Sequence, residues 1–171
     1  APAGQAGDVS VTVGQSGSGY DGANLQLISG EATPKEGAGG NITVSAGTGA
    51  QGGSIAVRAG NGGALEGVGG AVVVSGGKTA SHGTGGNVRV SGGKSSAGNS
   101  GKATVMTGDA PVGDSGDLRA STGASTKSNS GAVQIQTGTA ADQSGSISVE
   151  AGASGASSGG DISIKAGDTA E

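Results

Sequence analysis

The stretch Gly40-Asn-Ile-Thr-Val-Ser-Ala-Gly47 carries the pattern that decides the fold of this chain. It begins and ends with glycine, has aliphatic residues at its third and fifth positions, and has a small residue before the closing glycine. Eleven copies of this octapeptide occupy much of the 171 residues, beginning at residues 7, 23, 40, 53, 70, 86, 101, 116, 131, 145 and 160. Only the copy at Ala23 lacks the leading glycine. Self-similarity at such a period predicts a single repeat array over residues 1–171, in which each unit depends on its neighbours.

The composition excludes an ordinary globular core. Glycine accounts for 41 residues, Tyr20 is the only aromatic residue, and cysteine is absent. No apolar run approaches the roughly 20 residues needed to cross a bilayer, so we expect no membrane span. The net charge is −4 and neither sign forms a block, so we expect no nucleic-acid partner. The chain begins with Ala1 instead of Met, and we expect a processed product or part of a longer protein.

The aliphatic residues of each octapeptide are two positions apart, as in the pairs Ile42/Val44, Ile55/Val57 and Ile147/Val149. Period two with β-branched residues is typical of a strand that buries one face. The intervening positions are mostly polar, for example Thr43 and Ser148. The pattern therefore predicts eleven one-sided strands.

The segments between octapeptides are short and rich in Gly, Ser, Ala and Thr, as in residues 48–52 and 124–130. They could connect an antiparallel meander, or each could carry the chain once round a coil. A meander predicts two alternating kinds of turn, whereas here every connection resembles every other. We therefore predict an all-β fold, a parallel β-solenoid (β-helix) of about eleven rungs of ~15 residues. The small residues of the return segments predict a thin core.

Glycine closes every octapeptide, and we expect these residues to form structural corners in a backbone conformation that other residues rarely adopt. The closing glycines are Gly14, Gly30, Gly47, Gly60, Gly77, Gly93, Gly108, Gly123, Gly138, Gly152 and Gly167. The residue before a leading glycine is usually Ser or Gly, which predicts a second tight corner.

No constellation of residues indicates catalysis, so we predict that the chain is not an enzyme and binds no cofactor. His82 is the only histidine, and it is interpreted as a solvated loop residue because no partner for acid–base work is evident. Structural calcium is a weaker alternative. Asp8, Asp117 and Asp161 share one position in their repeats, but they belong to distant repeats and do not form a regular ladder.

Two surface features suggest further possibilities. Asn41-Ile42-Thr43 is the only Asn-x-Ser/Thr acceptor for a glycan. A flat face of small residues could bind ice or polysaccharide, and its candidate row is the position before the closing glycine in the last nine repeats. That row contains Ala46, Ala59, Gly76, Gly92, Thr107, Thr122, Thr137, Ala151 and Ala166.

Units such as Gly39–Gly47 and Gly159–Gly167 resemble the Gly-Gly-x-Φ-x-Φ-x-Ala-Gly repeats of large secreted proteins, where Φ is aliphatic. Those proteins are the filamentous-haemagglutinin-like bacterial adhesins and the Gly/Ser-rich repeat proteins of algae and protists. The resemblance covers essentially the whole chain. It implies an extracellular or cell-surface structural or adhesive rod or fibre segment, and no active-site residues. We expect self-association end to end or with other repeat chains. The alternative function is a module that binds an ordered surface, either ice or polysaccharide.

Overall fold

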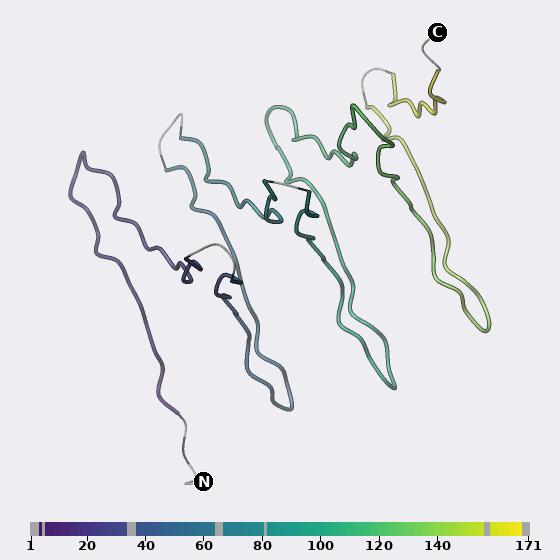
Figure 1. Ribbon diagram of the computed structural model, residues 1–171. Coiled ribbons are helices and arrows are strands. Elements are labelled where there is room, and N and C mark those ends of the chain that lie inside the picture. The colour runs from purple at the N-terminus through teal and green to yellow at the C-terminus, as the bar shows by residue number, and fades with distance from the viewer. Residues whose placement is uncertain are drawn as a thin grey trace. The chain divides into compact units, whose positions relative to one another are not determined.

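The computed structural model describes residues 4, 6–33, 37–63, 67–80, 82–155 and 158–168. Within these ranges the chain contains no helix and no strand, and Figure 1 draws it as a plain trace without coiled ribbons or arrows. None of the described residues is buried. Within the same ranges, no helix is present that could span a bilayer.

The chain divides into two units, Ala1–Val88 and Arg89–Glu171, and the division falls within the octapeptide 86–93. In each unit the octapeptides are extended segments, and the trace doubles back at successive loops (Figure 1). The loops hold most of the local structure. Tyr20 donates its N–H to the carbonyl oxygen of Gly17 at 3.3 Å, and Gly19 in that turn has φ of +83°. This is the geometry of a type II turn, which favours glycine at its third residue.

Six loops are closed by the same backbone hydrogen bond. The N–H of a leading glycine donates to the carbonyl oxygen of the preceding closing glycine, at 2.8–3.0 Å. We call this bond a glycine clasp. The clasps are Gly30–Gly40, Gly47–Gly53, Gly60–Gly70 and Gly77–Gly86 in the first unit, and Gly93–Gly101 and Gly152–Gly160 in the second.

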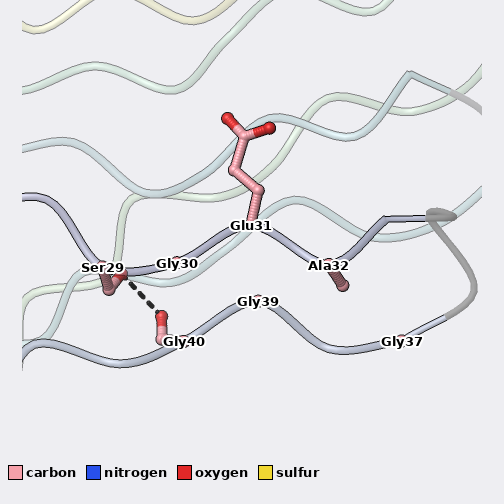
Figure 2. Close-up of a pocket in the computed structure, with 7 residues that line it drawn as sticks. All are labelled: Ser29, Gly30, Glu31, Ala32, Gly37, Gly39 and Gly40. Atoms are coloured by element: carbon pink, nitrogen blue, oxygen red, sulfur yellow. Dashed lines mark hydrogen bonds between the residues drawn. The ribbon is translucent and has the colours of Figure 1, made fainter.

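The clasps show that the predicted parallel β-solenoid, or β-helix, is wrong. In a solenoid, successive octapeptides run in the same direction and form ladders of hydrogen bonds with their neighbours. Here the end of one octapeptide is bonded to the start of the next, and Figure 2 shows residues 29–32 and 37–40 running in opposite directions. One bond per loop forms no ladder, so no rungs and no thin core arise in the described residues.

The aliphatic pairs fail to build a core because no second layer covers them. Ile42 and Val44 are 55% and 69% exposed, and the aliphatic pairs of the other repeats are likewise exposed. A glycine-rich backbone loses much conformational entropy on ordering, and the small side chains between the octapeptides bury little apolar surface to offset it. Alternation alone therefore does not produce a sheet in this chain.

We predict that clasp stability follows loop length. Gly47–Gly53 and Gly60–Gly70 both have alanine before the closing glycine, but they span six and ten residues along the chain. The entropic cost of closure grows as about (3/2)RT ln n, which favours the shorter loop by about 0.5 kcal/mol, or roughly twofold. Amide hydrogen exchange should therefore show about twofold more protection at Gly53 than at Gly70. Equal protection, or more at Gly70, would contradict this ranking.

Candidate functional site

The recurring structural site in this chain is the glycine clasp together with the residue that precedes its closing glycine. The leading glycine lies directly against that residue. A Cβ atom added to Gly53 would lie 3.3 Å from Ala46 Cβ and 3.3 Å from the backbone nitrogen of Gly47. At Gly86, an added Cβ would lie 2.9 Å from the backbone nitrogen of Gly77. The distance at Gly86 is too short for any side chain unless the backbone shifts, and the distances at Gly53 are tight, so the clasp favours glycine at the leading position.

The closing glycines differ in this respect. An added Cβ would meet nothing within 4 Å at any of the eleven closing glycines. Among the described glycines, positive φ occurs only at Gly19 and Gly113, and neither of these closes a repeat. The special corner conformation expected of Gly14, Gly30, Gly47 and the other closing glycines is therefore not found. Their part in the clasp is to supply a carbonyl oxygen.

The first complete clasp has an additional bond. Ser29 Oγ donates to the carbonyl oxygen of Gly40 at 2.9 Å, beside the Gly40 N–H bond to Gly30. Figure 2 shows this bond joining the two segments of the loop. The residues around it line an open hollow of about 390 Å³, consisting of Ser29, Gly30, Glu31, Ala32, Gly37, Gly39 and Gly40.

This hollow has no arrangement suited to catalysis or specific binding. Glu31 supplies its only charged side chain, and Figure 2 shows that side chain pointing away from the facing segment. Apart from Ser29, the other side chains of the hollow are methyl groups or hydrogen atoms. The hollow is therefore a consequence of loop closure.

The residues singled out from the sequence are not brought together. His82 is exposed, as are Asp8, Asp117 and Asp161. The Asp117 carboxylate accepts a hydrogen bond from Arg119 at 3.3 Å, an exposed ion pair of small energetic weight. In the part of the chain that the structure describes, no group of three or more His, Cys, Asp or Glu could hold a metal ion. Calcium binding stays a prediction.

Asn41 is exposed beside the clasp glycine Gly40, and its use as a glycan acceptor also stays a prediction. Three members of the row proposed for ice binding, Ala46, Ala59 and Gly76, are half-buried. The other six members are exposed: Gly92, Thr107, Thr122, Thr137, Ala151 and Ala166. Ala46 faces Gly53, and Ala59 faces Gly70. The alanine Cβ lies 3.3 Å and 3.4 Å, respectively, from the position that a Cβ atom would take on the glycine.

Comparison with protein-family models, with curated proteins and with solved structures gives no match. The resemblance to secreted adhesin-like and algal repeats therefore stays a prediction.

The two glycines of one clasp should respond differently to the same substitution. Gly86→Ala places a methyl group against the Gly77 nitrogen, so we expect the Gly77–Gly86 bond to be lost. Gly77→Ala meets open space at a backbone without positive φ, so we expect that bond to remain. The scalar coupling across the hydrogen bond, measured by NMR from the residue 86 nitrogen to the residue 77 carbonyl carbon, reports each result. The assignment fails if both variants behave alike.

Replacing Ser29 by alanine tests the additional bond. Ala46 and Ala59 occupy the equivalent position in closed loops, so we expect Ser29→Ala to keep the Gly30–Gly40 clasp. The loss of one exposed hydrogen bond of about 0.5–1.5 kcal/mol should lower the ratio of closed to open loop by about 2- to 12-fold. Amide exchange at Gly40 measures this ratio, with Gly53 as the internal control. An unchanged Gly40 amide would show that the hydroxyl contributes nothing.

Proposed function

We propose that this chain is an extracellular structural or adhesive fibre segment that works by extension and self-association and has no catalytic activity. The observation that carries the proposal is the recurrence of the glycine clasp along a chain whose paired aliphatic residues remain exposed. A weak hydrogen bond that closes one loop after another suits a protein that extends under tension and shortens again when the tension falls. The described residues offer no chemical centre that would suit an enzyme.

Extension follows from the geometry of a clasp. Gly30 and Gly40 are held with 2.9 Å between the carbonyl oxygen and the nitrogen. When the clasp opens, the ten residues from one glycine to the other can extend to about 33–36 Å. A single hydrogen bond contributes a net stability of about 1 kcal/mol, so a modest pull is enough to open it. The bond can form again when the tension falls, because both glycines stay in the same short loop.

Self-association follows from the exposed aliphatic pairs. A pair such as Ile55 and Val57, 54% and 72% exposed, recurs in most octapeptides with polar neighbours on either side. Burial of apolar surface contributes about 25 cal/mol per Å², and this chain has no interior in the described ranges in which to obtain it. A second copy offers the same period of aliphatic residues. We therefore propose that copies of this chain cover one another's aliphatic pairs.

The alternative function, binding of ice or polysaccharide, depended on a flat solenoid face. Ala46, Ala59 and Gly76 are half-buried, whereas the other six members of the row are exposed, so burial alone does not decide against contact with an extended surface. No observation favours this alternative over a fibre, and it stays a prediction. Assays of thermal hysteresis and glycan pull-down would detect it.

The fibre proposal predicts association that depends on concentration and on the aliphatic pairs. We expect sedimentation velocity to show growing species as the concentration rises, and electron microscopy to show elongated assemblies. A variant with serine at Ile42, Val44, Ile55 and Val57 should associate less, because it loses two aliphatic pairs. Its matched control carries serine at Ala50, Ala80, Ala97 and Ala140, which adds the same number of serine hydroxyl groups in the loops and leaves the aliphatic pairs intact. Compact particles that do not associate at any concentration would contradict the proposal.

A further inference from the structure

The nine loops that lie between two glycines divide by the residue that precedes the closing glycine. In the six loops with a clasp this residue is Ser29, Ala46, Ala59, Gly76, Gly92 or Ala151. In the three loops without one, which the structure describes in full, it is Thr107, Thr122 or Thr137. Hydrogen, methyl and hydroxymethyl side chains thus go with closed loops, and a β-branched side chain goes with open ones.

The contacts of the leading glycine explain this division. Where the clasp forms, the leading glycine lies over the side chain that precedes the closing glycine. A Cβ atom added to Gly40 would lie 3.3 Å from Ser29 Cβ, and one added to Gly160 would lie 3.4 Å from Ala151 Cβ. Gly76 and Gly92 allow an even closer approach, because a Cβ on either would overlap the carbonyl oxygen of Gly86 or Gly101. The space over this residue is therefore filled by the next repeat.

In two of the three open loops, threonine puts its methyl group into that space, whereas Gly116, which follows Thr107, meets no atom within 4 Å. The nearest atom to the Cβ position of Gly131 is Thr122 Cγ2 at 3.5 Å, and the nearest to that of Gly145 is Thr137 Cγ2 at 3.8 Å. In these loops the leading glycine meets the threonine methyl group in place of the backbone of the closing glycine. A β-branched side chain is restricted in χ1, so it cannot easily turn the methyl group away.

Two loops form a pair matched in length and in internal turn, although they differ at four of their seven positions. Residues 94–100 and 124–130 have the same length, and both end in Asn-Ser before the leading glycine. Both contain the same internal turn, in which a serine Oγ accepts a backbone N–H three residues later, at 2.9 Å for Ser95 and 3.1 Å for Ser125. The first loop is closed by a clasp and the second is not. The preceding residues are Gly92 and Thr122, respectively.

A preference for glycine at the position immediately before the leading glycine does not explain why some loops are closed and others are open. Ser100 occupies that position in a closed loop. An added Cβ on Gly85 or Gly159 would lie 3.5 Å from the nearest carbonyl oxygen, which is an ordinary contact. Sterics at this position therefore do not distinguish open loops from closed ones.

We infer that the residue before each closing glycine is a size gate that determines whether its loop closes. Ser, Ala or Gly allows the clasp, and the γ-methyl group of threonine prevents it. The three gated loops are consecutive and lie between Gly108 and Gly145 in the second unit. This stretch consequently extends without first breaking a clasp. The inference concerns the isolated chain and does not depend on the proposed fibre.

Exchange of the two gate residues tests this inference in the full chain. Through-hydrogen-bond NMR coupling detects each clasp directly, from the Gly101 nitrogen to the Gly93 carbonyl carbon and from the Gly131 nitrogen to the Gly123 carbonyl carbon. We expect Gly92→Thr to abolish the first coupling and Thr122→Gly to create the second. Each variant retains the other loop as an internal control.

Three further variants separate the methyl group from the hydroxyl group and from backbone effects. Thr122→Ser removes only the methyl group and should create the Gly123–Gly131 coupling. Thr122→Val keeps the branched shape without the hydroxyl group and should leave the loop open. Ser130→Gly should also leave it open. The size gate is overturned if the valine or Ser130→Gly variant closes the loop, if the serine variant leaves it open, or if the wild type lacks the Gly93–Gly101 coupling.

Discussion

The structure depends on a close balance between one backbone hydrogen bond and the entropy of the loop that the bond closes. The exposed bond contributes about 0.5–1.5 kcal/mol, whereas closing six to ten residues costs about 1.6–2.0 kcal/mol plus a constant. The free energy of the hydrogen bond and the entropic cost of closing the loop are therefore of similar size. Small packing differences at the glycine pair can therefore decide the outcome, and a single methyl group at Thr122 is of the required size.

The six clasps coincide with repeat boundaries, since each clasp joins the closing glycine of one octapeptide to the leading glycine of the next. The inferred β-solenoid was wrong because alternation indicates a strand only if another layer covers the aliphatic face. Ile42 and Val44 have the right spacing, but no described residue buries them. The rejected meander was closer in chain direction, although a single bond per loop does not produce its strands.

The different roles of the two glycines could not be predicted from the sequence, because leading and closing glycines recur equally often. The difference arises from the direction of the bond. The leading glycine donates its N–H to the end of the preceding repeat, so its own Cα lies against Ala46 or the equivalent residue of that repeat. The closing glycine contributes only its carbonyl oxygen to the bond. Two features of the sequence could have signalled this difference: the glycine before several leading glycines, and the small residue before most closing glycines. The first was interpreted as a solenoid corner and the second as a flat surface face.

On our proposal, variation of the residue before each closing glycine would give nearly identical repeats different resistance to extension. If every loop had the same gate residue, clasp stability would vary only with loop length, by about twofold between six and ten residues. Here the first unit contains four clasps, whereas the second contains two clasps and three loops gated by threonine. Because open loops already lack the hydrogen bond, our proposal has them take up the first extension, with the clasped loops resisting later. One side chain per repeat is thus enough to grade the response without altering the aliphatic pairs through which we propose that copies associate.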